Sequence, residues 1–292
     1  ALAELDALVE RIVRERRERL ARGGDAGEDV LASLLAARDV ALGDIDGDTD
    51  LDILAVVAEN DYAIPRLTIL YNDGAGLFGD PIEVGLFPGG ANIALGDVNG
   101  DGWLDVLVAN GGPQGSPSMT LLLNSGGLGF LPPRFVNLPV LPTALSLGDL
   151  DGDTDIDLAV VGSAGNASQL VTLLNTGMGF FNPRAAIDVT GDAVDVALGD
   201  LNGDGVLDFV TGSFDAVEQG RVSIAFGDGA GTFAGGAQFE IASQVHAVAV
   251  ARLDADPDFD IIAVTRDADG VSAATGMLND GSGLFTSIQR FP

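Results

Sequence analysis

Aspartates gather in short stretches of this sequence at a spacing that is typical of metal ligands. The first stretch reads GDIDGDTDLD over residues 43–52 and places an aspartate at every second residue from Asp44 to Asp52. Related stretches begin at Asp97, Asp149 and Asp200, and an altered one begins at Arg252, so the steps are 53, 52, 51 and 52 residues. Like charges this close repel each other, and more strongly beside an apolar interior. Their regular repetition indicates sites that a cation neutralises.

The oxygen donors in these acidic loops suit calcium. Numbered from its first Asp, each of the four intact loops has Asp or Asn at positions 1, 3, 5 and 9 and Gly at position 4. Ca²⁺ takes about six to eight hard oxygen ligands. The side chain at position 7 varies, so we expect a backbone carbonyl to serve there. Position 9 is Asp in all five loops, and we expect this carboxylate to close the site.

The loops begin like an EF-hand loop but are not EF-hands. That loop needs Gly at position 6 and a bidentate Glu at position 12. Gly102 and Gly205 satisfy position 6, whereas Thr49 and Thr154 do not, and position 12 is nowhere acidic. The flanking residues are also typical of strands.

The fifth loop, 252–260, departs from the pattern. Arg252 replaces the first Asp, Ala255 replaces Gly, and Pro257 follows, while three aspartates remain. We expect the Arg252 guanidinium to pair with the carboxylates of Asp254, Asp256 and Asp260 in place of a cation, which leaves this loop without metal.

Short β-rich runs must position these loops. In the first repeat DVALGD precedes the loop, and DILAVVA, RLTILYN and PIEVGLF follow it, which indicates four strands. The third strand always ends in a glycine-rich turn that closes on Phe, where glycine permits a positive φ. These glycine turns are residues 72–78, 124–130, 175–181, 227–233 and 279–285. The acidic loop and the glycine turn recur with the same period of about 52 residues. This repetition predicts an all-β fold, a β-propeller of five four-stranded blades.

Each repeat supplies all four strands of one blade. The first begins with its innermost strand at 40–42, and the last ends with its fourth strand at 287–291. We therefore expect five blades closed into a ring. A partial ring of about seven or eight blades, or an open arc completed by another chain, is the alternative.

The sequence pattern of residues 1–37 is helical and differs from that of the repeats. Apolar residues keep helical spacing over 2–22, Gly23 and Gly24 interrupt it, and Asp25 with Glu28 has capping-box spacing for a second helix at about 26–37. We divide the chain into this helical N-terminal segment, 1–37, and the propeller, 38–292.

Composition limits the classes of function. The 292 residues carry a net charge of −30, with no Lys and no Cys. Such an acidic chain repels nucleic acid and anionic membranes, and no apolar run reaches the ~18 residues of a membrane helix. Without Cys there is no thiolate catalysis, disulfide or Cys-bound zinc or haem. The only histidine, His246, lies in an innermost-strand pattern, and we expect it to be packed or at a solvent edge rather than catalytic.

The pattern Asp-x-(Asp/Asn)-Gly-Asp-x-x-x-Asp between short strands resembles the FG-GAP/VCBS repeats found in integrin α-subunit heads and bacterial secreted proteins. The resemblance covers residues 38–292 and implies a propeller with structural Ca²⁺, about four ions, in the loops between the first and second strands of its blades. Carried onto this sequence, the implied side-chain ligands are Asp44, Asp46, Asp48 and Asp52; Asp97, Asn99, Asp101 and Asp105; Asp149, Asp151, Asp153 and Asp157; and Asp200, Asn202, Asp204 and Asp208. The backbone carbonyls of Asp50, Trp103, Asp155 and Val206 complete the four implied sites.

Residues 5–39 also resemble a helical stretch of bacterial haem-thiolate monooxygenases. That stretch contains no catalytic motif, and without Cys the axial thiolate cannot exist, so no monooxygenase activity is assigned.

The leading hypothesis is a non-enzymatic calcium-binding propeller that presents loops to a protein or glycan ligand in extracellular adhesion. A lectin-like or polysaccharide-processing module is the alternative, although Trp103 and Tyr62 alone make a poor sugar platform. A third hypothesis is a purely structural or assembly unit in which the N-terminal helix docks a partner or another copy of the chain. An extracellular or secreted location follows from the family and from the low free Ca²⁺ of the cytosol.

Overall fold

The computed structural model describes residues 37–291 except 59–63, 76, 112–115, 242 and 267–269, with the backbone alone from residue 286 onward. All regular elements in these residues are β-strands, and none is a helix. The helical segment predicted over 1–37 lies outside the described residues, apart from Ala37, which begins the first strand. The all-β prediction for residues 38–292 is confirmed in the part of them that the structure describes.

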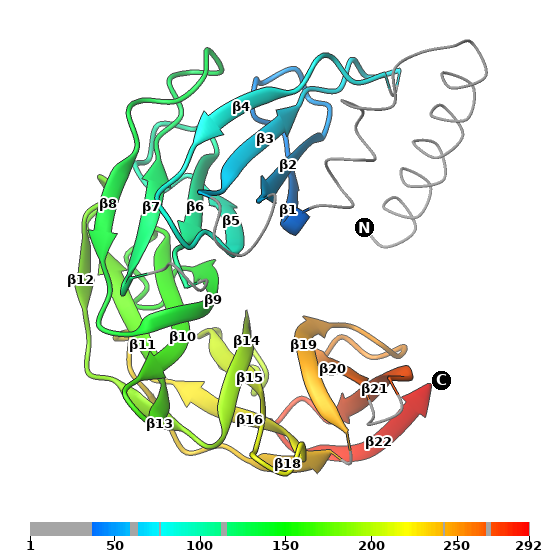
Figure 1. Cartoon of the computed structure of the whole chain (residues 1–292). Coiled ribbons are helices and arrows are strands. Elements are labelled where there is room, and N and C mark those ends of the chain that lie inside the picture. The colour runs from blue at the N-terminus through cyan, green and yellow to red at the C-terminus, as the bar shows by residue number, and fades with distance from the viewer. Residues whose placement is uncertain are drawn as a thin grey trace. The chain divides into compact units, whose positions relative to one another are not determined.

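The strands form five antiparallel sheets, and in each sheet the first four strands are paired in sequence order (Figure 1). The first sheet contains β1 (Ala37–Gly43), β2 (Asp52–Val57), β3 (Arg66–Leu70) and β4 (Ile82–Gly85). The second contains β5 (Asn92–Gly96), β6 (Asp105–Ala109), β7 (Ser118–Leu122) and β8 (Arg134–Asn137). The third contains β9 (Leu141–Gly148), β10 (Asp157–Ala164), β11 (Ala167–Asn175), β12 (Phe181–Pro183) and β13 (Ile187–Val189).

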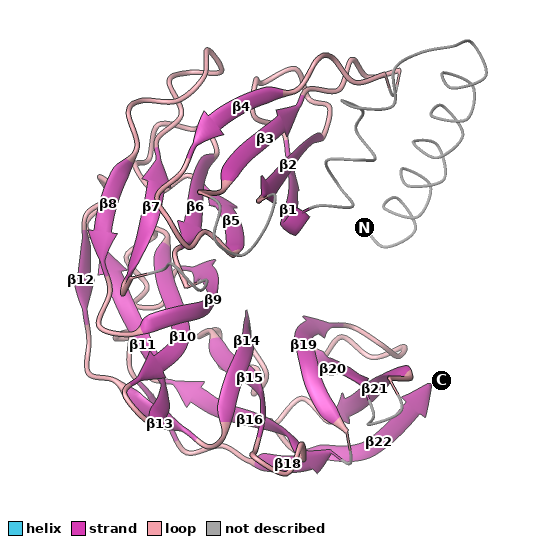
Figure 2. Ribbon diagram, in the orientation of Figure 1, coloured by secondary structure: helices cyan, strands magenta, loops and turns pink. Residues whose placement is uncertain are grey.

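The fourth sheet contains β14 (Asp192–Gly199), β15 (Asp208–Phe214), β16 (Gly220–Gly227), β17 (Phe233–Ala234) and β18 (Gln238–Ile241). The fifth contains β19 (Gln244–Ala251), β20 (Asp260–Arg266), β21 (Ser272–Asn279) and β22 (Phe285–Phe291). Strands and loops alternate throughout (Figure 2). An antiparallel meander of four strands is the blade of a β-propeller.

The third and fourth blades have a divided outer strand. Both β12 and β13 pair with β11, and both β17 and β18 pair with β16. Between β17 and β18 lie Gly235 and Gly236, both with positive φ, which interrupts the extended backbone. The expected fourth strand is present in both blades as two short pieces.

The second strand of the first blade, DILAVV, is apolar after its first aspartate and is buried at every residue. A strand covered on both faces needs such a continuous apolar run. This strand therefore anchors the acidic loop, which ends at its first residue.

By its contacts the chain divides into two compact units. The first contains the sheet β1–β4 and most of β5–β8, and its core includes Leu54, Ile69, Val106 and Leu122. The second contains the sheets from β9 onward with residues 96–102 and 117–119. One core cluster of the second unit joins residues of the third and fourth blades, and another joins the fourth and fifth.

Candidate metal centre

Every acidic loop connects the first strand of a blade to the second. The register fixes both ends of the loop, because the residue before position 1 pairs with position 9. In the first blade Gly43 pairs with Asp52, and in the third Gly148 pairs with Asp157. The fourth blade repeats this with Gly199 and Asp208. Each loop is thus a hairpin connection held at its base by strand pairing.

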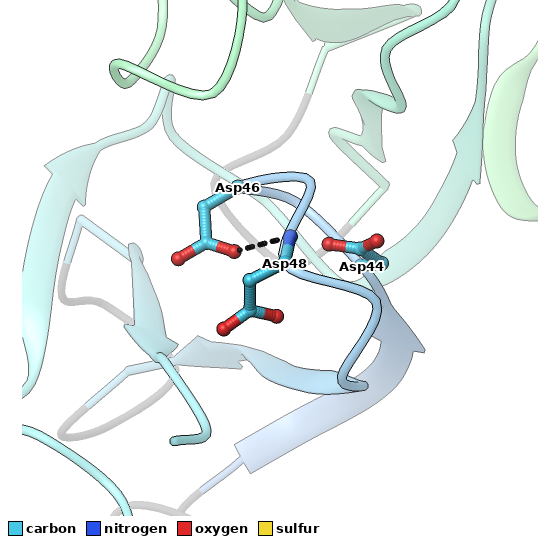
Figure 3. Close-up of side chains that lie close together, drawn as sticks. All are labelled: Asp44, Asp46 and Asp48. Atoms are coloured by element: carbon cyan, nitrogen blue, oxygen red, sulfur yellow. Dashed lines mark hydrogen bonds between the residues drawn. The ribbon is translucent and has the colours of Figure 1, made fainter. Parts of the chain in front are cut away.

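Carboxylates converge in the first and third loops. One oxygen from each of Asp44, Asp46 and Asp48 lies within 4.8 Å of the other two (Figure 3), and positions 1, 3 and 5 of the third loop, residues 149–157, do the same. The second and fourth loops have Asn at position 3. There the Asn99 Nδ2 donates a 3.0 Å hydrogen bond to Asp101 Oδ2. Amide and carboxylate oxygens are both ligands that Ca²⁺ accepts.

Backbone amides wind each loop around its first aspartate. The Asp44 carboxylate accepts hydrogen bonds from the amides of Gly47 at 2.7 Å and Thr49 at 2.9 Å. The carboxylates at position 1 of the other three intact loops accept the equivalent bonds. Alternate side chains then face the inside of the turn, which is the geometry that the spacing predicted.

Two left-handed residues complete the winding. Position 4 is a glycine with positive φ in all four intact loops, and position 6 is also left-handed, with φ of 87° and 84° at Gly102 and Gly205. Thr49 and Thr154 adopt the same conformation at 77°, although a β-branched residue is strained there. The EF-hand-like turn is therefore kept even where glycine is missing.

Replacing Thr49 with glycine should raise the free energy of unfolding by up to about 1 kcal/mol. Relief of the left-handed strain is worth roughly 1–2 kcal/mol, and the greater freedom of unfolded glycine offsets about 0.5–1 kcal/mol of it. The reverse change, Gly205→Thr, is the matched control, because a Cβ added there meets no atom within 4 Å. It should be destabilising. Urea unfolding in EDTA measures both, and a destabilised Thr49→Gly protein would contradict the expectation.

Among the described residues, no salt bridge offsets the charge of the clustered carboxylates. Burial raises the pKa of Asp46, and repulsion from Asp48 and Asp44 adds to the rise. Burial and repulsion from Asp153 raise the pKa of Asp151 in the same way. The Asp151 Oδ1 atom is also buried without a hydrogen-bond partner among the described residues. A bound cation would supply the missing partner and favour the ionised forms.

The side chain at position 7 leans away from the converging carboxylates. A Cβ added to Gly177 of the glycine turn would lie 2.7 Å from Asp155 Oδ2. Asp50 lies against Gly74 in the same way. This placement is compatible with a backbone carbonyl ligand at position 7, because the side chain is occupied elsewhere.

Position 9 has a structural role that the sequence did not reveal. The five aspartates here are completely buried. Asp157 Oδ2 accepts the Leu150 amide at 2.8 Å, and its Oδ1 accepts the Asn175 amide at 2.7 Å. Burial raises the pKa of Asp157 to about 6. These bonds tie the loop to the third strand, so Asp is required at position 9 whether or not it also contacts a metal.

The ion pairs expected of Arg252 are wrong. Its guanidinium carbon lies 5.1 Å from the centre of the Phe259 ring, a cation–π arrangement, and the described residues give it no salt bridge. The loop also lacks both left-handed turns, because Ala255 does not have positive φ and the ring of Pro257 holds φ near about −65°. Asp260 nevertheless keeps its bonds to the Leu253 and Asn279 amides. The fifth loop has therefore kept the structural aspartate at position 9 but lacks the left-handed residues at positions 4 and 6.

The residues considered for other chemistry are not gathered into a site. His246 is exposed on β19. Trp103 is packed against Gly47 and Gly127, where an added Cβ would lie 2.7 Å from its ring. Tyr62 lies outside the described residues. A sugar platform therefore gains no support from the described aromatic residues.

Five propeller-type blades with acidic loops define an all-β repeat protein. The model of the FG-GAP-like repeat matches residues 44–108, 97–160 and 149–211. These overlapping matches span more than half of the chain, which belongs to the FG-GAP-like repeat family. The resemblance expected from the acidic loops is confirmed. The resemblance of residues 5–39 to a monooxygenase helix lies almost wholly outside the described residues.

Other comparisons are more distant. No curated protein matches the chain. Among solved structures, it is similar to the V. cholerae biofilm matrix protein Bap1, with 17% identity and a TM-score of 0.49 over 86% of this chain and 38% of that one. It is also similar to BBS1N, solved in complex with ARL6DN, with 11% identity and a TM-score of 0.46 over 88% and 82% of the two chains. No described helix is long and apolar enough to span a membrane.

Proposed function

We propose that this chain is a non-enzymatic, calcium-binding propeller module in which the four intact acidic loops each hold one structural Ca²⁺. Side-chain oxygens at positions 1, 3, 5 and 9 and the backbone carbonyl at position 7 would hold the ion. The convergence of Asp44, Asp46 and Asp48, with oxygens within 4.8 Å of one another, carries this proposal.

The metal would supply charge neutralisation and order rather than catalysis. The chain has a formal net charge of −30, and four Ca²⁺ ions would offset eight of those charges. A site that forms only in the folded chain stabilises that chain when it is filled. Ca²⁺ would therefore stabilise the loops against the repulsion between their own aspartates.

The module would act by presenting its loops to a protein or glycan ligand in extracellular adhesion. Extracellular Ca²⁺ is high enough to fill weak sites of this kind, whereas cytosolic Ca²⁺ is not. The strong negative charge argues against nucleic acid and anionic membrane surfaces as partners. Membership of the FG-GAP-like repeat family supports a secreted location.

Calorimetric titration of EDTA-stripped protein with CaCl₂ tests the metal sites. We expect about four ions per chain and a higher melting temperature in Ca²⁺ than in EDTA. Asp48→Asn, at position 5 of the first loop, should lower the count by about one. Asp256→Asn, at the same position of the fifth loop, is the matched control and should leave the count unchanged. An absence of binding, with the same melting curve in Ca²⁺ and EDTA, would refute the proposal.

A further inference from the structure

The carbonyl at position 2 of each intact acidic loop accepts a hydrogen bond from the glycine turn of the next blade. In the first unit, Asn124 Nδ2 donates to the Ile45 carbonyl at 2.9 Å. In the second unit, Asn175 Nδ2 donates to the Val98 carbonyl at 2.7 Å. The side chain of Asn279 donates to the Leu201 carbonyl, also at 2.7 Å. All three side chains are buried.

Backbone amides make the same connection. The Gly179 amide donates to the Val98 carbonyl at 2.8 Å, and the Gly231 amide donates to the Leu150 carbonyl at 2.9 Å. The turn that contains Gly231 begins with Gly227 in place of Asn, so the backbone bond alone joins it to Leu150. Each of the four intact loops is thus bonded to the turn that follows in the next blade.

These bonds reach the carbonyl of position 2, which lies between expected metal ligands in the sequence. Position 2 lies between ligand positions 1 and 3, and position 4 lies between 3 and 5. In the fourth loop position 4 also faces the next turn, since a Cβ added to Gly203 would lie 3.3 Å from the Gly281 carbonyl oxygen. An ion that fixes positions 1, 3 and 5 therefore also fixes position 2, the residue that is bonded to the neighbouring blade.

We propose that each filled acidic loop clamps the following blade, so that Ca²⁺ bound in one blade holds the glycine turn of the next blade in place. The proposal rests on the metal sites proposed above and states in which direction their ordering effect passes along the chain. The part of the loop that contacts its own turn, positions 7 to 9, includes the expected ligands at 7 and 9, but strand pairing and the amide bonds of the buried position-9 aspartate hold this part with or without metal. Ordering by the metal should therefore be transmitted forward, from the loop of one blade to the turn of the next.

Amide hydrogen exchange, resolved at Gly179 and Gly231, tests the direction of coupling. Two matched double variants remove the charges of positions 1 and 5 but keep oxygen acceptors: Asp97→Asn with Asp101→Asn in the second loop, and Asp149→Asn with Asp153→Asn in the third. In saturating Ca²⁺, the second-loop variant should speed exchange at Gly179 by about tenfold and leave Gly231 unchanged. The third-loop variant should speed exchange at Gly231 and leave Gly179 unchanged, although the turn of Gly179 belongs to the same blade as the third loop.

EDTA provides the control for damage unrelated to metal. Without Ca²⁺, the full-length wild type and both variants should exchange at similar rates at the two amides. A variant effect that persists in EDTA, or equal acceleration of both amides by each variant, would overturn the clamp. Ca²⁺ protection of the loop amides of Gly100 and Gly152 with no response at Gly179 and Gly231 would overturn the clamp alone. If Ca²⁺ protects no amide of the wild type, the metal sites themselves are refuted, and the clamp with them.

Discussion

Replacing Asp260 with alanine is expected to lower the free energy of unfolding by about 3–6 kcal/mol. Its carboxylate is fully buried and accepts the Leu253 amide at 2.7 Å and the Asn279 amide at 2.9 Å. A hydrogen bond to a charged group contributes about 1.5–3 kcal/mol, and alanine leaves both donors without this acceptor. Since this loop is expected to hold no metal, Ca²⁺ stoichiometry should stay the same. Urea unfolding and calorimetric titration of one preparation measure both quantities.

Asp256→Ala is the control from the same loop. Asp256 is exposed, and most exposed substitutions change stability by no more than about 0.5 kcal/mol. A small effect for Asp260→Ala, comparable to that of Asp256→Ala, would contradict the structural role of position 9. A fall in the number of bound ions would instead show that the fifth loop binds metal.

The metal-free protein should be more stable near pH 4.5 than near pH 7. Burial raises the pKa of Asp157 to about 6 in the folded chain, from an ordinary value of 3.8. Between these values the folded chain binds more protons than the unfolded chain, so the free energy of unfolding falls as pH rises. Burial also raises the pKa of Asp39, Asp52 and Asp208, which adds to the same trend. Thermal melting in EDTA across this pH range measures it.

Ca²⁺ should reverse this dependence. Its carboxylate ligands must be ionised, so protons compete with the ion and binding strengthens as pH rises. The melting temperature in saturating Ca²⁺ should therefore be higher near pH 7 than near pH 4.5. Hydrogen bonds from Thr232 and Ser282 lower the pKa of Asp228 and Asp280, and stability from these two groups is lost only below their ordinary range. A metal-free protein whose melting temperature rises from pH 4.5 to 7 would contradict the expectation.

Local sequence was sufficient to predict the blades and the winding of their loops. Runs such as DILAVV specify buried strands, and the glycines at position 4 specify the left-handed turns that face the carboxylates inward. Both signals act within about ten residues, where spacing and backbone preference determine the structure. The division of the outer strands in the third and fourth blades is a smaller detail, since both halves still pair with the third strand of the blade.

Contacts between distant residues were harder to predict. The Arg252 prediction considered only the charges of its own loop, whereas the guanidinium lies on the Phe259 ring. The bonds from Asn124, Asn175 and Asn279 join residues 77–79 positions apart. The sequence did contain a signal for these bonds, because Asn begins four of the five glycine turns. Glycine-rich turns also favour Asn for local reasons, however. Only the packing of one blade on the next separates the two explanations.

The position of Trp103 has a practical consequence. It is the only tryptophan of the chain, it occupies position 7 of the second acidic loop, and its ring rests on Gly47 of the first loop and Gly127 of the neighbouring turn. Indole emission from the unlabelled protein therefore originates at one known place, where two of the loops and a turn come together. The native chain carries its own optical reporter, and no dye or engineered fluorophore is needed to observe this joint in solution.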